Sequence, residues 1–400
     1  MDQKVESLSM EIINPHAAGI DIGSRSHWVS IGQKEKDTLE FGVFNDDLKA
    51  IADWLAENKI TTVAMESTGT YWQALYPVLL AHGFQVILCN GKFTKNIKGR
   101  KTHIQDCAWI QKLHSIGLLS GSLLPDETTE TVRTYCRQRT NWLTLAAEAS
   151  HKMQKYLKLL NFRLDVVVND ICGLTGMAII EDICRGNHDP EKLAEHRHGN
   201  CRKPKEEIAK ALKGNNRADY LFGLKQELES YQFYQKKIVE CDKQITSFLK
   251  AQINTSPTKK KLKTTDKPHK RLNKNALKGI DLNQAAYQYF EGVDLMAVEG
   301  MSHATILTIV SEIGPQGFKR FGTAKEFKSW LRLAPNNKIS GGKLLSSKTP
   351  KGCNRLKIAL RNAANSIGNL KDTHLSNFFA RISYRKGRTV AVSATAQNLQ

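Results

Sequence analysis

The first 120 residues alternate between short apolar runs and longer amphipathic segments, which is the pattern of an α/β domain. Five apolar runs have the length and period of strands, at 17–24, 27–31, 39–44, 61–67 and 84–90. Segments with a helical period separate or follow them, at 46–58, 71–82 and 103–117. The first three runs favour antiparallel pairing, whereas a strand–helix–strand order implies parallel pairing with the strand ends on one edge.

The remainder of the chain is predicted to be mainly helical. Two long amphipathic segments, 126–160 and 220–250, are separated by an expected loop at 196–205. Apolar residues recur every three or four positions in 220–250, a spacing typical of a coiled-coil or bundle seam. Nearer the C-terminus, 294–314 predicts two helical segments around Gly300, an arrangement similar to a helix-hairpin-helix element.

The charge balance of the chain is strongly basic. Fifty-nine Lys and Arg against 39 Asp and Glu give a formal net charge of +20 and a pI near 9.5. A charge of this size indicates a polyanionic partner, most commonly nucleic acid. Part of it lies in 254–278, where nine Lys or Arg accompany one Asp, so this segment is predicted to be a basic linker. The expected domains are 13–122, 123–253, the linker at 254–280, and 281–400.

Other classes of basic protein are disfavoured by what the sequence lacks. It has no stretch of about 18 apolar residues, so no membrane span is expected. Its N-terminus lacks the basic and apolar regions of a secretory signal, so none is expected. The eight cysteines contain no CxxC pair, which favours reduced structural thiols in a cytoplasmic protein over a zinc module or a disulfide scaffold.

Three carboxylates occupy unusual positions in the predicted α/β domain. Asp21 interrupts the first strand, Glu66 ends the fourth, and Asp106 lies near the start of the helix at 103–117. A carboxylate in an apolar strand is costly unless it is paired, hydrogen-bonded or bound to metal. If the two strands are neighbours, the carboxylates converge, and a pair of Mg²⁺ ions offsets their repulsion. The alternative is that Asp21 and Glu66 are strand-end carboxylates bonded to turn amides.

A basic segment directly before that helix favours the metal hypothesis. Residues 91–101 contain five Lys or Arg and no acid, which places phosphate-binding charge beside the carboxylates. Arg133 and Arg137, one turn apart in 126–160, share a face of the helix. This face either contacts the phosphates of a nucleic acid or is simply solvated. The candidate nucleic-acid contacts in the basic segment are Lys98, Arg100 and Lys101.

Three motifs in this part of the chain carry a family resemblance. In order and spacing, GIDIGSR, MESTGTYW and GRKTHIQDCAWIQKLHSIGLLSGS resemble the RuvC-like domain of DEDD-type transposases from bacterial insertion sequences, described as bridge-RNA-guided recombinases. The resemblance implies a ribonuclease-H-like fold that binds Mg²⁺, or alternatively Mn²⁺, through four acidic residues. By position, the first is Asp21, the second Glu66 and the fourth Asp106. The chain resembles the longer-insert branch of the family, and a coiled-coil region used for dimerisation is implied.

The third metal-binding position departs from the family pattern. The family reads Lys-Thr-Asp where this chain has Lys101, Thr102 and His103. His103 and Asp106 are three apart on a helix and share a face, so both can reach one metal site. A neutral imidazole binds divalent ions but suits Mg²⁺ less well than a carboxylate does. Three interpretations stay open: a tolerated ligand, a changed metal preference, or an inactive catalyst.

A basic loop near the C-terminus suggests a second chemistry. Ser340 is followed by two glycines, which permit close backbone approach to a phosphate, and nearby cations would stabilise an attacking alkoxide. From the residues alone, the ordinary interpretation is a phosphate-binding or flexible turn. The family resemblance implies that Ser340 is a nucleophile that forms a phosphoserine link to DNA, with Ser346 and Ser347 as weaker alternatives. The candidate nucleic-acid contacts here are Lys338, Lys343, Lys348, Lys351 and Arg355.

The carboxylates of the α/β domain and the serine loop near the C-terminus each form half of an expected catalytic site. Together these half-sites predict a transposase of the bacterial cytoplasm that cleaves, exchanges and rejoins DNA strands. Metal at Asp21, Glu66 and Asp106 is expected to position the scissile phosphate and activate Ser340, and a 3′-hydroxyl of the partner strand would resolve the phosphoserine. The resemblance also implies double-stranded donor and target DNA, a structured guide RNA, and a homodimer assembling to a tetramer with half-sites from different subunits. The alternatives are a RuvC-like junction resolvase and a degenerate, non-catalytic nucleic-acid-binding transposase.

Overall fold

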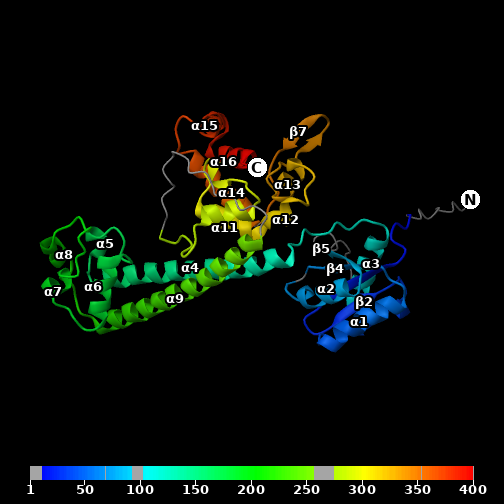
Figure 1. Ribbon diagram of the computed structural model, residues 1–400, viewed down its shortest axis with the longest axis horizontal. Coiled ribbons are helices and arrows are strands. Elements are labelled where there is room, and N and C mark those ends of the chain that lie inside the picture. Colours follow the sequence, from blue (N-terminus) through cyan, green and yellow to red (C-terminus); the bar gives the residue numbers. More distant parts are fainter. Residues whose placement is uncertain (1–10, 68, 92–101, 256–273, 353, 400) are drawn as a thin grey trace, which may run out of the picture. The chain divides into compact units, whose positions relative to one another are not determined.

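The computed structural model describes residues 11–67, 69–91, 102–255, 274–352 and 354–399. The chain divides into two compact units, Met1–Leu124 and Pro125–Gln400. The first is a mixed α/β unit, and the second is mostly helical (Figure 1). The predicted fold class, an α/β N-terminal part followed by a mainly helical remainder, is confirmed at this level. Within the described ranges, no helix is both long and apolar enough to cross a membrane.

A five-stranded sheet with the order β3-β2-β1-β4-β5 forms the centre of the first unit. Its strands are β1 (Ala17–Ile22), β2 (His27–Ser30), β3 (Thr38–Phe41), β4 (Thr62–Glu66) and β5 (Gln85–Cys89), and a 3-10 turn, η1 (Glu35–Asp37), precedes β3. The first three strands pair antiparallel, and β4 pairs parallel with both β1 and β5, as the sequence predicts. This mixed sheet is consistent with a ribonuclease-H-like fold.

Helices cover both faces of this sheet. One face packs against α1 (Asn45–Glu57) and α2 (Trp72–Ala81), and α3 (His103–Ser115) covers the other. The alternation along β1 assigns its residues to these faces. Ile20 enters the core with α1 and α2, whereas Gly19 and Asp21 face α3.

The close approach of α3 to the sheet depends on Gly19. A Cβ at this position would lie 2.2 Å from the backbone nitrogen of Gln111 and 2.5 Å from the carbonyl oxygen of Cys107. Further along the helix, Nε2 of His114 is hydrogen-bonded to the hydroxyl of Thr62 at 2.9 Å. Because later helix residues meet earlier strand residues, α3 runs antiparallel to β1 and β4. Its N-terminus therefore lies at the carboxyl ends of these strands.

Two long helices form the shaft of the second unit. α4 (Glu127–Leu159) and α9 (Ala218–Thr255) pack side by side and run antiparallel (Figure 1). Several apolar positions of α9, among them Leu224, Ile238 and Ile245, are buried within this one chain. Intramolecular packing thus occupies the predicted seam, and a coiled coil between chains stays a prediction.

A small helical subdomain lies at one end of the shaft. It contains α5 (Leu164–Val167), α6 (Leu174–Cys184), α7 (Pro190–Ala194) and α8 (Lys205–Ala211) (Figure 1). These helices and the adjoining ends of α4 and α9 share an apolar core of their own. The loop predicted at 196–205 lies between α7 and α8.

The other end of the shaft is built into the core of the C-terminal helices. Val132 of α4 and Leu249 of α9 belong to the same buried cluster as Ile306 and Leu360. The C-terminal elements are α10 (Leu282–Tyr289), η2 (Leu295–Ala297), α11 (His303–Glu312), α12 (Gly314–Phe318), α13 (Ala324–Trp330), β6 (Lys338–Ser340), β7 (Lys343–Ser346), α14 (Arg355–Ile367), α15 (His374–Lys386) and α16 (Arg388–Asn398). The regions expected as separate domains, 123–253 and 281–400, therefore share one compact unit.

The basic linker ends earlier than the sequence predicts. Leu277 is buried in the C-terminal core, and the carbonyl oxygen of Asn275 accepts a 2.8 Å hydrogen bond from Arg139. The last part of the expected linker at 254–280 is therefore packed against protein. Residues 256–273 lie outside the described part of the chain.

The segment 294–314 has a short 3-10 helix before its glycine and one α-helix after it. Leu295–Ala297 form a single 3-10 turn, and α11 begins at His303. Gly300 has a φ of 76°, and a Cβ there would lie 2.6 Å from the carbonyl oxygen of Ala363 in α14. Because another helix occupies this space, the glycine serves close packing of protein on protein. The helix-hairpin-helix interpretation is not supported at this position.

Candidate functional site

Asp21 and Glu66 are neighbours at the carboxyl edge of the sheet. β1 and β4 are parallel, and their register places Ile20 opposite Met65. The next residues along the two strands are Asp21 and Glu66, which therefore project from the same face. Strands paired in this way lie about 5 Å apart. β1 and β4 are neighbours, as a shared site requires, and convergence of the two carboxylates stays a prediction.

His103 lies against Asp21 at the N-terminus of α3. The Nδ1–H of His103 donates a 2.8 Å hydrogen bond to Oδ2 of Asp21. The imidazole also stacks on the indole of Trp28, with ring centroids 6.1 Å apart and an interplanar angle of 12°. Trp28 is the residue of β2 that pairs with Asp21. The imidazole, which is 65% exposed, therefore contacts a carboxylate through Nδ1 and lies beside an indole.

Asp106 lies one helical turn from Ile110, on the side of α3 that faces β4. Ile110 packs against Ala64 of β4 in a small apolar cluster. Since α3 is antiparallel to the strands, one turn back from Ile110 leads towards the carboxyl end of β4, where Glu66 lies. Asp106 is half-buried at this edge. The helix thus brings a third carboxylate to the strand ends.

The carboxylate of Glu66 lies against Gly91, shortly after β5. A Cβ on Gly91 would come within 2.2 Å of Oε1 of Glu66, so a side chain there would displace the carboxylate. Burial, helped by the negative charge of Glu66, raises the pKa of the Cys89 thiol to about 11. The candidate nucleic-acid contacts that follow in the sequence, Lys98, Arg100 and Lys101, lie outside the described residues.

The donor types at this edge fit a divalent cation. Asp21, Glu66 and Asp106 offer carboxylate oxygens, which Mg²⁺ and Mn²⁺ prefer, and His103 offers an imidazole nitrogen. In the described ranges, no group of three or more His, Cys, Asp or Glu side chains is close enough together to hold a metal ion. The edge therefore carries suitable ligands that are not gathered around one point.

Ser340 ends β6, directly before a two-glycine turn. It pairs with Lys343 of β7, so the predicted loop is a short hairpin. Gly341 and Gly342 have φ values of 54° and 74°, which glycine adopts without strain in a two-residue hairpin turn. Ser340 is exposed, and no described atom lies within 4 Å of where a Cβ on either glycine would be. The backbone beside the serine is open to a ligand.

A buried lysine fixes the base of this hairpin. Lys357 of α14 donates from Nζ to the carbonyl oxygens of Arg332 at 2.9 Å and Pro350 at 3.2 Å. Arg332 in turn donates from Nη1 to the carbonyl oxygen of Lys351 at 2.7 Å. Burial, together with the positive charges of Arg361 and Arg332, lowers the pKa of Lys357. The hairpin therefore has an open tip on an anchored base.

The cations near the hairpin face solvent. The sequence has ten Lys or Arg and no carboxylate between Glu326 and Asp372. Arg355 is exposed, and its Nε lies 3.9 Å from Oε1 of Glu312. The other candidate contacts of this region are also exposed: Lys338, Lys343, Lys348 and Lys351.

Two models of known families match the chain, one over the carboxylate edge and the other over the serine hairpin. A family of DEDD transposases, described as transposase of the IS110 type, matches residues 18–162, which contain β1, β4 and α3. The transposase IS116/IS110/IS902 family matches residues 294–380, which contain the hairpin and α14. The chain belongs to the IS110 family of DEDD transposases. A search of curated proteins found no match.

Two arginines of this IS110-family transposase have protein partners in place of the phosphates considered from the sequence. Arg133 is 14% exposed and donates to the carbonyl oxygens of Ser311 at 3.3 Å and Glu312 at 2.8 Å. Arg137 donates to both carboxylate oxygens of Glu312, at 3.1 and 2.7 Å. These bonds join α4 to the end of α11. Arg133 in particular is not accessible to a nucleic-acid backbone.

Three residues of the transposase site are not found by sequence reasoning. The sequence does carry a signal for the role of Gly19, because a glycine inside a buried strand marks a close backbone approach. Trp28 requires the exact register of β1 and β2, which the pattern of apolar residues does not specify. Lys357 looks like one more solvated cation in a basic run, and only its tertiary contacts reveal its burial.

Proposed function

We propose that this transposase cleaves, exchanges and rejoins DNA strands with Ser340 as its nucleophile and a divalent metal bound by Asp21, Glu66 and Asp106. The observation that carries the proposal is the position of Ser340, exposed beside an open two-glycine turn on a base that Lys357 anchors. A hydroxyl held in this way is accessible to a phosphodiester without movement of the surrounding backbone.

In the first step, Oγ of Ser340 attacks the phosphorus of a phosphodiester in line with its bond to the 3′-oxygen. The P–Oγ bond forms as the P–O3′ bond breaks, Oγ loses its proton, and the departing oxygen gains one. The products are a 3′-hydroxyl and a 5′-phosphoserine. A 3′-hydroxyl of the partner strand then attacks the same phosphorus, and Oγ recovers a proton. Each step exchanges one phosphoester bond for another, so the bond energy is retained.

The cations of the second unit support this chemistry. Lys338 and Lys343 lie on the two hairpin strands beside Ser340, where positive charge stabilises an alkoxide and the transferring phosphate. Lys348, Lys351 and Arg355 continue the positive charge towards α14, and we assign them to the DNA backbone. Such contacts position the strand and carry no sequence information.

The carboxylate edge of the first unit is the proposed metal site. Asp21, Glu66 and Asp106 supply the oxygen ligands, and Nε2 of His103 supplies a fourth donor. A bound divalent ion supplies charge stabilisation to the transferring phosphate. The role of His103 within the protein is to hold the carboxylate of Asp21 in one orientation through its Nδ1–H.

The proposal includes a structured guide RNA and a homodimer that assembles to a tetramer. The motifs shared with bridge-RNA-guided recombinases support both, and the net charge of +20 suits an RNA together with two DNA duplexes. Lys98, Arg100 and Lys101 are assigned to this nucleic acid as well. Each catalytic centre would combine the metal site of one subunit with Ser340 of another.

Complementation between subunits tests this proposal. Cells carry a plasmid with the DNA that flanks the gene, and new DNA junctions are counted by sequencing. Asp21→Asn and Ser340→Ala are each expected to abolish junctions when expressed alone and to restore them when expressed together. Activity of Ser340→Ala by itself would refute the assignment of the nucleophile, and failure to complement would refute shared centres. Sequencing the RNA that co-purifies with the protein tests the guide, which should map to the flanking DNA.

A further inference from the structure

The C-terminal helices α15 and α16 carry positive charge that the hairpin site does not use. From Thr373 to the end of the chain, the sequence has four Lys or Arg and no Asp or Glu. Three of these cations, Arg381, Arg385 and Lys386, are exposed on α15 and form no ion pair with any described residue. Positive charge that the protein itself does not neutralise favours a polyanionic partner.

Tyr384 stands in the middle of this charge. Its side chain is 94% exposed, an unusual state for a large aromatic ring. Helical spacing puts it on one face of α15 with Asn377, Ala380 and Arg381, which are all exposed. A ring that docks on a protein is normally part of a wider apolar patch, and these neighbours are small, polar or charged. A single ring among cations is the combination that binds single-stranded nucleic acid.

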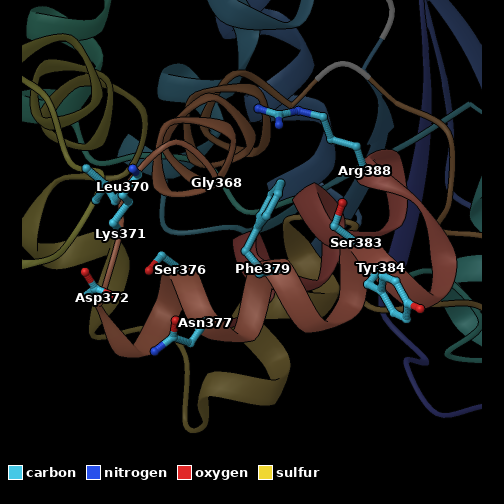
Figure 2. Close-up of a pocket in the computed structure, with 11 residues that line it drawn as sticks. Gly368, Leu370, Lys371, Asp372, Ser376, Asn377, Phe379, Ser383, Tyr384 and Arg388 are labelled. Atoms are coloured by element: carbon cyan, nitrogen blue, oxygen red, sulfur yellow. The ribbon is translucent and has the colours of Figure 1, made fainter.

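The ring of Tyr384 borders a hollow between α15 and the end of α14. The hollow has a volume of about 460 Å³, within the range of roughly 300–1,000 Å³ that is usual for small-ligand sites. Buried Phe379 forms its floor, and Arg388 lies 5.4 Å from that ring and donates to Oδ1 of Asn365 at 2.8 Å. Figure 2 shows Tyr384 projecting outward from α15 and Arg388 reaching back past Phe379. The other polar residues that line the hollow are Lys371, Asp372, Asn377, Ser376 and Ser383.

We propose that this surface, formed by Arg381, Tyr384, Arg385 and Arg388 and called the α15 face, binds an unpaired nucleotide of a DNA or RNA strand. The base stacks on Tyr384, and the neighbouring phosphates lie along the cations. A base within a duplex has both of its faces covered by the bases above and below it, so the α15 face discriminates against paired strands. The inference requires a nucleic-acid partner and does not depend on Ser340 being a nucleophile.

Binding of short oligonucleotides to the full-length protein tests the inference. Fluorescein-labelled DNA and RNA strands of about 12 nucleotides, and a blunt DNA duplex, are titrated by fluorescence anisotropy. Tyr384→Ala is expected to weaken single-strand binding about tenfold, because one stacked base is lost, and to leave duplex binding unchanged. Tyr384→Phe keeps the ring and should bind like the wild type. Phe222→Ala removes an aromatic ring that is 66% exposed on α9 and serves as the matched control.

Photocrosslinking locates the contact directly. A strand with 5-iodouracil at one position is irradiated in the complex, and mass spectrometry identifies the attached residue, which is expected to be Tyr384. The DNA and RNA strands distinguish the two sources of the nucleotide. The inference is overturned if Tyr384→Ala binds single strands like the wild type, or if it weakens duplex binding equally. Ser340→Ala should retain both binding and the crosslink. A wrong assignment of the nucleophile would therefore leave these results unchanged and can be distinguished from failure of the present inference.

Discussion

The Nδ1–H of His103 donates to Oδ2 of Asp21 across 2.8 Å. Because an ionised carboxylate only accepts hydrogen bonds, Nδ1 of His103 carries a proton in this contact, and in a neutral imidazole Nε2 keeps its lone pair. His103 can therefore orient Asp21 and present a second nitrogen to a metal at the same time. The aspartate of the family pattern would instead place a second negative charge beside Asp21, which requires a bound cation to offset it.

We expect His103→Asp to lower the melting temperature without divalent metal and to increase the stabilisation that added Mg²⁺ produces. Two adjacent carboxylates repel one another, and a cation that binds only the folded state reverses this cost. Thermal unfolding with and without Mg²⁺ measures both effects. His103→Asn adds no charge and should show neither effect. If all three proteins respond equally to Mg²⁺, residue 103 does not belong to the metal site.

Gly19→Ala is expected to destabilise the first unit and to impair recombination. The added Cβ would meet the backbone of Gln111 and Cys107, so α3 would have to move away from the sheet with His103 and Asp106. Overpacking of this kind costs about 1–3 kcal/mol of unfolding free energy. Urea denaturation measures the cost, with Gly199→Ala as the control because nothing lies within 4 Å of that position. A stability equal to that of the wild type would disprove the tight helix–sheet contact.

His114 should make stability depend on pH below neutrality. It is 1% exposed, and burial lowers its pKa below the usual 6.5, so it stays neutral in the folded chain. Below pH 6.5 the unfolded chain takes up a proton that the folded chain does not. The stability therefore falls as the pH drops towards the folded pKa, by at most about 1.4 kcal/mol per pH unit for this group.

Urea denaturation at about pH 7.5 and 5.5 tests this behaviour, with His114→Gln as the comparison. The glutamine does not titrate and its amide can still reach the hydroxyl of Thr62. The variant should lose less stability between the two pH values than the wild type does. An equal loss in both proteins would mean that His114 does not titrate differently on unfolding.

Lys357→Met should strongly reduce strand joining while the protein stays folded, with only a modest loss of stability. The variant leaves the carbonyl oxygens of Arg332 and Pro350 without their donor, at a cost of about 1–3 kcal/mol, and loosens the base that carries Ser340. Recombination assays and thermal melts measure the two effects separately. Lys325→Met removes an exposed lysine of α13 and is the control. Wild-type joining by Lys357→Met would contradict the anchoring role.

Local patterns predicted the first unit well because its central strands β1 and β4 are largely buried. The alternation that buries Ile20 also assigns Asp21 to the opposite side of β1, where α3 lies. The hairpin at Lys338–Ser346 escaped prediction because its short strands are exposed on both faces and show no alternation. The partners of Arg133 and Lys357 are distant in sequence, and a cation bonded to a carbonyl oxygen looks the same in sequence as a solvated one.

Covalent trapping of DNA tests directly whether Ser340 becomes joined to a strand. The purified protein is incubated with labelled DNA carrying the flanking sequences, its co-purified RNA and Mg²⁺, then denatured and resolved by size. We predict a labelled protein band that disappears in Ser340→Ala and persists in Ser347→Ala, with mass spectrometry finding the nucleotide on Ser340. Cleaved DNA with no attached protein, formed equally well by Ser340→Ala, would show that Ser340 is not the nucleophile.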